Sequence, residues 1–482
     1  MTETAFISTA IPYVNAKPHI GFALEIVQAD AVARYLRRRG WDVFFLTGTD
    51  ENSLKNVRAA QEQEISTREL CDRNSEAFQG LGPALAISRD YFIRTSIDPL
   101  HAAGAQKLWA RSRPEDIYKK HYTGLYCVGC EDFYTEKDAP GGVCPDHGAK
   151  LEMVEEENYF FRLSHYQSAI LDLLESGRLR IVPEGRRNEM LSFVRAGLQD
   201  FSISRSRKRA GDWGIPVPGD PHQVMYVWYD ALTNYITALD YAGEGPLYKK
   251  YWVDCARRIH VIGKGINRFH TIYWPAMLLS AGVPLPHTVF VHGYLTINGQ
   301  KISKSLGNII DPVEQVARFG TDPVRFYLLR AVSPYDDGDF SEKRFREIYN
   351  VDLANNLGNL SRRVETIGEK AGYSLPPSEG VPDAPPGFHE AMADCRFHDA
   401  IGCLWAVATT LNQRVEELKP WELQKQGRTA EVKAFLGEMV QGLRVLAYWL
   451  EPFMPGTAGK LAAVYAPGRK LVRSEPLFPR LR

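Results

Sequence analysis

The sequence lacks the features that mark several large classes of protein. No apolar run approaches the roughly 18 residues needed to span a bilayer. The N-terminus has no basic segment ahead of an apolar stretch, which argues against a secretory signal. Neither sign of charge is in excess, with 58 basic and 58 acidic residues, so any nucleic-acid surface must be local. These absences predict a cytoplasmic protein that does not enter a membrane.

The common nucleotide-binding loops are also missing. There is no Walker A motif, GxxxxGK[ST], and no GxGxxG placed between a strand and a helix. Cysteine is scarce, and of the seven cysteines only Cys127, Cys130 and Cys144 lie near one another. An odd number with one cluster is typical of a reducing compartment and a metal site rather than of a disulfide framework. Any nucleotide must therefore be bound by another motif.

The sequence does contain the rhythm of a parallel sheet. Residues 5–10 predict a buried strand, residues 19–39 a helix with apolar residues at helical spacing, and residues 41–48 a second strand. Strand signals return at 226–228, 258–263 and 288–293 and fade after about residue 350. This pattern predicts an α/β fold with a doubly wound parallel sheet, followed by an all-α region. Ligands in such sheets bind beyond the carboxyl ends of the strands.

Two short segments supply residue types suited to phosphate. His19 and Gly21 lie where the first predicted helix begins, and free N–H groups at a helix N-terminus favour anions. Lys301 and Lys304 lie in the run Lys-Ile-Ser-Lys-Ser, and lysine is a point charge suited to a polyphosphate whose charge shifts during reaction. Each segment alone is also typical of an ordinary turn or a solvated loop.

Together and in this order, the two segments resemble the signatures of the class I aminoacyl-tRNA synthetases, His-Ile-Gly-His and Lys-Met-Ser-Lys-Ser. Phe22 stands in place of the second histidine, and Ile302 in place of methionine. The latter is a volume-conserving exchange. The former removes a donor whose loss costs about 2.7–4 kcal/mol of transition-state stabilisation where nothing replaces it. The resemblance implies a Rossmann-like catalytic domain with His19, Lys301 and Lys304 as catalytic residues.

Further stretches resemble the methionyl-tRNA synthetases, and the similarity covers essentially the whole chain. They are AIPY at 10–13, TGTDE at 47–51, YVWYDA at 226–231, WPAM at 274–277 and FVHGY at 290–294. The resemblance implies contacts to L-methionine by Ala10, Ile11, Tyr13, Asp50, Trp228, Ala231, Tyr235, Ile266, His270 and Trp274. It implies contacts to ATP, which binds with Mg²⁺, by His19, Gly21, Gly263, His292, Gly293, Lys301 and Lys304. Gly265 stands where the family often has aspartate.

The residue types of the predicted methionine site agree with its substrate. Trp228 and Tyr235 lie on one face of a predicted helix, and His270 and Trp274 lie four apart on another. A thioether packs well against such rings, and Asp50 at a strand end can hold the α-ammonium group. A pocket gains only about 1–3 kcal/mol from one methylene, so relatives for valine, isoleucine and leucine carry large editing insertions. The insertion here, of about 100 residues, is too small for that.

A metal site is predicted within this insertion. Cys127, Cys130, Cys144 and His147 follow the pattern C-x2-C-x13-C-x2-H, and two such pairs can meet at a tetrahedral Zn²⁺. Because all four positions are filled, the site should be structural rather than catalytic. Metal binding would add about 10–16 kcal/mol of folding free energy, by analogy with zinc-finger peptides. The resemblance agrees with one zinc knuckle near the path of the tRNA acceptor end.

The helical end of the chain resembles the family's anticodon-binding bundle. Asn359 and Arg363 lie on one helix face and can read base edges, while Trp421 can stack on an unpaired base. We expect a monomer, because no further C-terminal domain of the kind that makes some relatives dimers follows. Five segments are predicted: catalytic halves at 1–115 and 216–295, the zinc-knuckle insertion at 116–215, a stem-contact region with the lysine loop at 296–350, and the anticodon-binding domain at 351–482.

The predicted function is ligation of L-methionine to its tRNA through methionyl-adenylate, with release of pyrophosphate from ATP. Two alternatives stay open. Phe22 and Gly265 also suit a non-catalytic tRNA-binding protein on a degenerate synthetase scaffold, although the intact lysines and Asp50 favour an enzyme. A synthetase for cysteine uses zinc to bind its substrate, but its ligands would be spread through the catalytic sheet rather than packed into a 21-residue knuckle.

Overall fold

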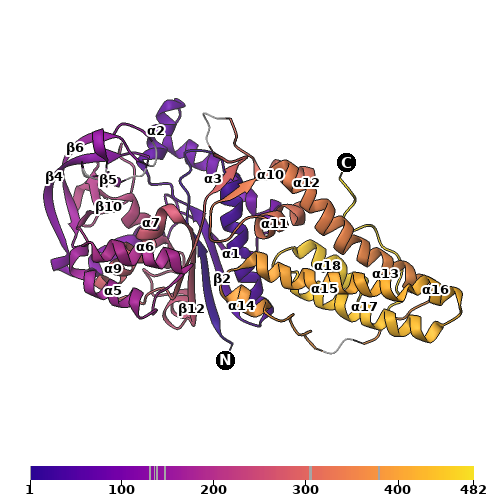
Figure 1. The fold of residues 1–482 in the computed structure, drawn as a ribbon. Helices are drawn as coiled ribbons and strands as arrows, with labels where there is room; N and C mark the ends of the chain where they lie inside the picture. Colours follow the sequence, from indigo (N-terminus) through magenta and orange to yellow (C-terminus); the bar gives the residue numbers. More distant parts are fainter. Residues whose placement is uncertain are drawn as a thin grey trace. The chain divides into compact units, whose positions relative to one another are not determined.

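The computed structural model describes residues 2–129, 132–134, 136, 139–145, 148–302, 307–377 and 380–481. The chain divides into two compact units (Figure 1). The first unit comprises Met1–Pro18, Arg39–Gly82 and Ser88–Val291, and the second comprises His19–Arg38, Pro83–Ile87 and His292–Arg482. No helix among the described residues is both long and apolar enough to cross a membrane.

A six-stranded sheet with the order β3-β2-β1-β12-β13-β7 forms the centre of the first unit. Its strands are β1 (Thr4–Thr9), β2 (Asp42–Thr49), β3 (Tyr91–Arg94), β7 (Arg180–Val182), β12 (Arg257–Gly263) and β13 (Thr288–His292). The pairs β1–β2, β1–β12, β2–β3 and β7–β13 are parallel. Seven of the eight residues of β2 are buried, as expected for a parallel sheet covered on both faces. The predicted α/β fold with a parallel sheet is confirmed.

Helices of the first unit surround this sheet. They are α2 (Leu54–Glu62), α3 (Thr67–Ala84), α4 (His101–Arg111), α5 (Gln167–Glu175), α6 (Glu184–Arg195), α7 (Val227–Thr237), α8 (Pro246–Tyr248) and α9 (Trp274–Ala281), with π-helical turns at Lys249–Val253 and Phe269–Tyr273. The helices α4 and α7 pack against each other. One large apolar cluster runs from the sheet through α7 and the turn before α9, so these elements share a single core.

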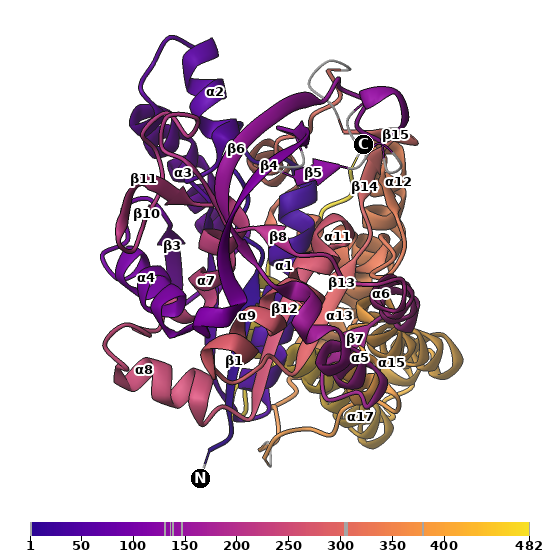
Figure 2. The ribbon, with the colours of Figure 1, turned by 90° about the vertical axis from the view of Figure 1, so that its left-hand side faces the viewer.

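Two smaller antiparallel sheets interrupt the parallel one along the chain. The first has the order β5-β4-β6-β8, formed by β4 (Ile117–Cys127), β5 (Asp132–Tyr134), β6 (Glu152–Phe161) and β8 (Phe201–Ser202). Its long strands β4 and β6 lie side by side in Figure 2. The second comprises β9 (Ser204–Ser206), β10 (Pro216–Val217) and β11 (Asp220–Met225).

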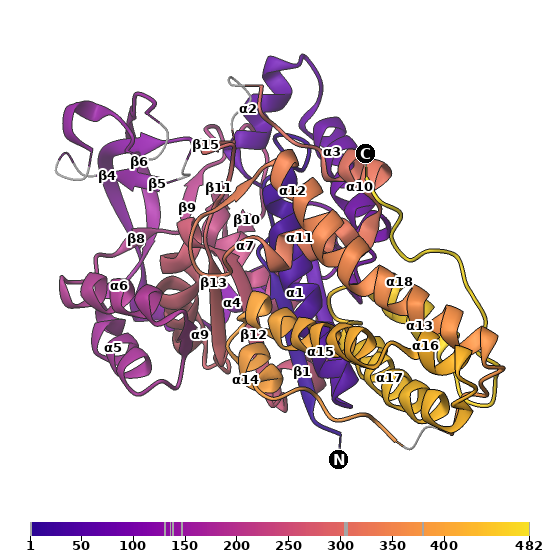
Figure 3. The same ribbon diagram turned by 45° about the vertical axis from the view of Figure 1, so that its right-hand side comes forward.

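The second unit is mostly helical, which confirms the predicted all-α region. It contains a small sheet of β14 (Leu295–Ile297), β15 (Gln300–Lys301) and β16 (Gly338–Phe340). Its helices beyond residue 291 are α10 (Pro312–Phe319), α11 (Thr321–Arg330), α12 (Glu342–Ile348), α13 (Asn359–Lys370), α14 (Phe388–Ala393), α15 (Phe397–Leu418), α16 (Pro420–Lys425), α17 (Thr429–Trp449) and α18 (Pro455–Val464). A π-helical segment, Tyr349–Gly358, leads directly into α13. Figure 3 shows α13, α15 and α17 alongside one another, in agreement with their contacts.

The helix α1 (Ile20–Arg38) joins β1 to β2 along the chain but clusters with the second unit. It packs against α11. Asp30 of α1 and Arg325 of α11 are both fully buried and form an ion pair of 2.7 Å. The guanidinium of Arg325 also donates to the carbonyl oxygens of Leu85, Pro452 and Phe453. A buried arginine that is paired and fully hydrogen-bonded is costly to disturb, so these contacts hold α1 to the helical region.

Candidate functional site

Asp50 and Tyr13 lie together beyond the ends of β1 and β2, as the parallel sheet requires. The Asp50 N–H donates to the Pro12 carbonyl at 2.9 Å, and Asp50 forms an isolated parallel bridge with Tyr13. The side chain of Asn56 donates to the Asp50 carbonyl at 3.0 Å. Ala10 and Ile11, from the same extension of β1, pack against the main apolar cluster. Four of the predicted methionine residues therefore share one edge of the sheet.

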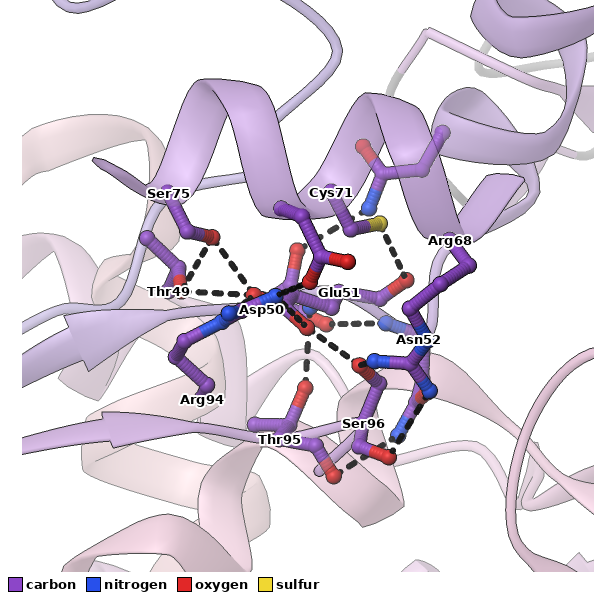
Figure 4. A network of polar contacts seen from close by, with 12 residues as sticks. Thr49, Asp50, Glu51, Asn52, Arg68, Cys71, Ser75, Arg94, Thr95 and Ser96 are labelled. Carbon is purple, nitrogen blue, oxygen red and sulfur yellow. Dashed lines mark hydrogen bonds and ion pairs between the residues drawn. The ribbon is translucent and has the colours of Figure 1, made fainter. Parts of the chain in front are cut away.

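Glu51, the neighbour of Asp50, is held on every side (Figure 4). Its fully buried carboxylate accepts hydrogen bonds from Ser75 at 2.5 Å and from Arg94 Nε at 2.6 Å, and another from Ser96. Its N–H donates to Thr95 Oγ1 at 2.8 Å, and its carbonyl accepts from Trp213 Nε1 at 2.6 Å. Because both peptide groups of Glu51 are engaged, the backbone that aims Asp50 has little freedom.

The aromatic residues predicted to bind methionine form one cluster. The Trp228 ring lies in T-shaped contact with Tyr13 at a centroid distance of 6.4 Å, and it stacks on Phe269 at 3.7 Å. Tyr235, two turns further along the same face of α7, contacts the Trp274 ring at a centroid distance of 6.0 Å. Phe269 begins a π-helical turn, a feature found frequently at functional sites.

His270 joins the two sides of this cluster through hydrogen bonds. Its Nδ1 lies 2.9 Å from the Ile266 carbonyl, and its Nε2 lies 2.6 Å from the Tyr235 hydroxyl. Since a carbonyl only accepts, Nδ1 carries the proton and Nε2 accepts from Tyr235. Burial lowers the pKa of His270 to about 4, so the ring is neutral at pH 7. Hydrogen bonds therefore connect the predicted residues Ile266, His270 and Tyr235. Ala231 is buried on α7, the helix that carries Tyr235.

On the phosphate side, His19 folds back over the start of α1. The Gly21 N–H donates to His19 Nδ1 at 3.1 Å, which leaves the proton of the neutral ring on Nε2. The Phe22 ring lies 4.8 Å from the His19 ring. Burial lowers the pKa of His19 to about 4. A Cβ atom on Gly21 would come within 2.8 Å of His19 Cε1, so this arrangement requires glycine.

The lysine loop begins from a tight hairpin in the same unit. Asn298 and Gly299 join β14 to β15 with φ values of 50° and 75°, as a two-residue hairpin turn requires. Lys301 ends β15 and is exposed. Lys304 lies outside the described residues.

The start of α1 and the two flanks of the lysine loop lie next to each other. The Ile20 N–H donates to the Ile310 carbonyl at 3.0 Å, just beyond the loop. The Cβ position of Gly21 lies 3.9 Å from Ile302 Cδ1, just before the loop's undescribed part. Two segments almost three hundred residues apart in sequence are thus adjacent within one unit.

The remaining residues predicted to bind ATP lie at strand ends. Gly263 ends β12. His292 ends β13, donates from Nδ1 to the Gly293 carbonyl at 2.7 Å and places Nε2 at 2.9 Å from Glu25 of α1. A Cβ atom on Gly293 would lie 2.1 Å from the Asp336 carbonyl oxygen, so only glycine fits there.

The predicted metal ligands are described only in part. Cys127 and Cys144 are buried in one small apolar cluster with Ala139 and Leu151. Cys130 and His147 lie outside the described residues. Within the described ranges, no group of three or more metal-binding side chains occurs.

The residues predicted to bind the anticodon lie on the surface of the helical bundle. Asn359 and Arg363 are exposed on α13, and Arg363 forms an ion pair of 2.5 Å with Glu416 of α15. Trp421 of α16 is 39% exposed. The side chain of Gln424 on α16 donates to the Ile367 carbonyl on α13 at 3.0 Å, so the two helices are neighbours.

Sequence reasoning missed the polar residues that surround the predicted ones. Glu51 follows Asp50 directly, and Glu25 lies one turn after Gly21 on the same helix face. Both could have been suspected from their positions beside a motif. The partner of Glu51, Arg94, carries no local signal, whereas the partner of Glu25 is His292, which the sequence already predicted to contact ATP.

Comparisons with known proteins agree over the whole chain. A family model described as tRNA synthetases class I (M) matches residues 5–153 and 142–365. A methionine--tRNA ligase of Thermotoga maritima is 41% identical over 99% of this chain and 80% of its own length, and one of Brucella suis is 42% identical over 99% and 98%. The solved Mycobacterium tuberculosis methionyl-tRNA synthetase in complex with methionyl-adenylate superposes with a TM-score of 0.92 at 37% identity, covering 99% of this chain and 100% of that one.

Proposed function

This chain belongs to the class I methionyl-tRNA synthetases, and on that premise we propose how its own residues carry out the family's reaction. The protein ligates L-methionine to its tRNA in two steps. Methionine and ATP form methionyl-adenylate with release of pyrophosphate, and the methionyl group then passes to the 3′-terminal adenosine of tRNA. The single observation that carries this conclusion is full-length similarity to a synthetase solved with methionyl-adenylate.

Methionine is held at two points in the first unit. Asp50 accepts the α-ammonium group, and the rings of Tyr13, Trp228, Tyr235 and Trp274 surround the thioether, with Ala10, Ile11, Ala231, Ile266 and His270 completing the slot. Two observations support these roles. The Asp50 backbone is clamped beside Tyr13, and the hydrogen bond from Tyr235 to His270 leaves no proton on His270 Nε2. The slot therefore offers methionine apolar surface rather than a charge.

The triphosphate is held by residues that can donate or carry positive charge. His19 donates from Nε2, because its Nδ1 already accepts the Gly21 N–H. Lys301 and Lys304 neutralise the phosphates, and Gly263, His292 and Gly293 contact the nucleoside. Mg²⁺ accompanies the ATP and supplies further charge compensation. The methionine carboxylate attacks the α-phosphate in line, so positioning and charge stabilisation suffice and no protein nucleophile is needed.

Phe22 adds no hydrogen-bond donor to the site and instead packs beside His19. Its ring centroid lies 4.8 Å from that of the imidazole at an interplanar angle of 40°, and burial lowers the pKa of His19 to about 4. The neutral ring then holds its one proton on Nε2 across the physiological range. One hydrogen-bond donor to the phosphates, His19 Nε2, thus acts where the family signature has two histidines.

Zinc fits the described members of the knuckle. Cys127 and Cys144 come from separate segments and are buried in the same small cluster, where thiolates need a metal or another partner. Cys130 and His147 would complete a tetrahedral set. Bound zinc would stabilise the fold of this insertion.

The helical unit recognises the tRNA anticodon through Asn359, Arg363 and Trp421. Their exposure on neighbouring helices supports this role. Arg363 must release Glu416 to contact RNA, and an exposed ion pair of this kind is weak enough to be exchanged. The five-segment division and the monomeric state remain predictions, and light scattering of the purified protein tests the latter.

Pyrophosphate exchange into ATP tests the function directly. We expect exchange that depends on methionine and is negligible with cysteine, valine, isoleucine or leucine. Exchange without methionine dependence would contradict the assignment. Substituting Trp421 by alanine should lower aminoacylation of tRNA while leaving exchange unchanged, because the first step needs no anticodon contact. Equal losses in both assays would contradict the anticodon role.

A further inference from the structure

Asn52 contacts two carboxylates that belong to different parts of the methionine site. Its N–H donates to Asp50 Oδ1 at 3.2 Å, and its side-chain amide donates to Asp230 Oδ2 at 2.7 Å. Asp50 directly follows the end of β2, whereas Asp230 lies in the first turn of α7. One residue thus joins the end of the sheet to the helix that forms the wall of the slot.

The contact continues into the core beyond Asp230. The other oxygen of this carboxylate, Oδ1, lies 2.6 Å from His101 Nε2 of α4. Since an ionised carboxylate only accepts, His101 donates from Nε2. Its Nδ1 lies 2.8 Å from the Thr237 hydroxyl, two turns further along α7. Asp230, His101 and Thr237 are all fully buried. His101 therefore forms two buried hydrogen bonds with side chains of α7.

Each end of the Asn52 bridge is held within its own part of the fold, and Asn52 connects the two parts. On the sheet side, the backbone is held by the contacts of Glu51 with Arg94 and Ser75 (Figure 4). On the helix side, α7 is held through His101. The slot residue Ala231 follows Asp230 directly on α7, and Trp228 lies two residues before it. The side chain of Asn52 thus connects the part of the site proposed to bind the ammonium group of methionine with the part proposed to bind its side chain.

We propose that Asn52 is a specificity-determining positioning residue that sets the separation between these two sites and thereby the length of amino acid accepted. The proposal rests on the function assigned above to Asp50 and α7. A pocket discriminates by one carbon only about 10–200-fold, and only when the substrate's other end cannot shift to compensate. Asn52 supplies that restraint, because the amide joins the carboxylate-bearing loop to the slot helix.

The test compares three amino acids in pyrophosphate exchange. Homocysteine lacks the S-methyl group of methionine, and ethionine is longer than methionine by one methylene. Asn52→Ala keeps the backbone donor to Asp50 but removes the bridge to Asp230. We expect the preference in kcat/KM for methionine over homocysteine and over ethionine to fall about tenfold. The KM for methionine should rise, and the KM for ATP should stay unchanged.

Asn412→Ala is the matched control. Asn412 is half-buried like Asn52, and its amide also donates at 2.7 Å, to Asn356 in the helical bundle. It should lower thermal stability by a similar amount without changing either preference. Asn52→Gln keeps an amide donor on a side chain one methylene longer, so it should recover stability while its preferences still differ from those of the wild type.

The outcomes separate the proposal from the function beneath it. If Asn52→Ala activates all three amino acids with the wild-type ratios, Asn52 is merely structural and the proposal fails. If Asn52→Ala does not fold, Asn52→Gln decides, and wild-type ratios in that variant overturn the proposal. Absence of methionine-dependent exchange in the wild type would instead overturn the assigned function.

Discussion

The region around Asp50, proposed to bind methionine, and the region around Lys301, proposed to bind phosphate, have opposite character. Around Asp50 the polar groups are buried and held, and Glu51 alone makes contacts to β3, α3 and the segment before β10. Around the lysine loop, Lys301 is exposed at the end of a two-residue hairpin. The first region holds its polar groups in fixed positions, whereas the second exposes a lysine side chain next to a hairpin turn.

The chemistry explains this difference. Choosing one amino acid from another by a methyl group yields only about 1–3 kcal/mol, so the slot must not relax around the wrong one. Charge on the triphosphate, by contrast, moves from the α-phosphate to the departing pyrophosphate. A lysine carries its charge as a flexible point that can follow this movement.

Asp50→Asn should have the largest effect, because it leaves the ammonium of methionine without its charged partner. Removing one member of a buried charge pair costs about 2–5 kcal/mol, which corresponds to about 30-fold to several-thousandfold in kcat/KM for methionine. Pyrophosphate exchange at varied methionine measures this loss. The control Asp322→Asn removes a carboxylate that caps α18 instead and should leave the KM for methionine unchanged. Equal losses in both variants would remove the distinction between the two carboxylates.

Lys304→Ala should act on rate rather than on methionine binding. Loss of a charge that stabilises the transition state costs about 2.7–4 kcal/mol, or about 10²–10³-fold in adenylate formation. Single-turnover kinetics give this rate, and calorimetry gives the dissociation constant for methionine, which should hardly change. An exposed lysine on α12, Lys343, provides the control substitution. Parallel losses in rate and in methionine affinity would contradict a separate phosphate region.

The neutral histidine of the slot should make stability depend on pH. The pKa of His270 is about 4 in the folded protein and about 6.5 in the unfolded chain, so between these values the unfolded chain binds more protons. Stability should therefore fall as pH decreases from 6.5 towards 4, by about 2 kcal/mol from this residue at pH 5. Urea unfolding at pH 7.5 and pH 5 should show a smaller difference in His270→Gln than in the wild type. The same difference in both would show that His270 is not the buried neutral group inferred here.

Substituting glycine by alanine at two positions of the second unit should change activity least. In Gly21→Ala, the new Cβ atom would lie 2.8 Å from His19 Cε1 and displace the ring by a fraction of an ångström. We expect about a tenfold fall in exchange activity. Gly402, inside α15, has open space at its Cβ position, so Gly402→Ala should preserve activity and add about 0.5–1 kcal/mol of stability. A fully active Gly21→Ala would show that the His19 position is not critical.

Local patterns predicted the elements that depend on neighbouring residues. The buried run at residues 41–48 predicted β2. The position of Asp50 directly after this strand agrees with the rule that ligands bind beyond the carboxyl ends of parallel strands. The hairpin formed by Asn298 and Gly299 before Lys301 was not predicted, although its sequence suits such a turn. Membership of α1 in the helical unit was not predictable, because it depends on Arg325 meeting Asp30 across almost three hundred residues.

The fold class, the family and the residue types available for methionine, phosphate and metal could be predicted because short runs of neighbouring residues encode them. The protonation and the hydrogen-bond partners of those residues could not be predicted in this way. Three features depend on the environment of each group after folding: the protonated nitrogen of His270, the contact of Phe22 with His19, and the bridge from Asn52 to Asp230. The physical reason is that hydrogen-bond direction and desolvation arise from groups brought together in space, whereas a sequence motif records only what lies next along the chain.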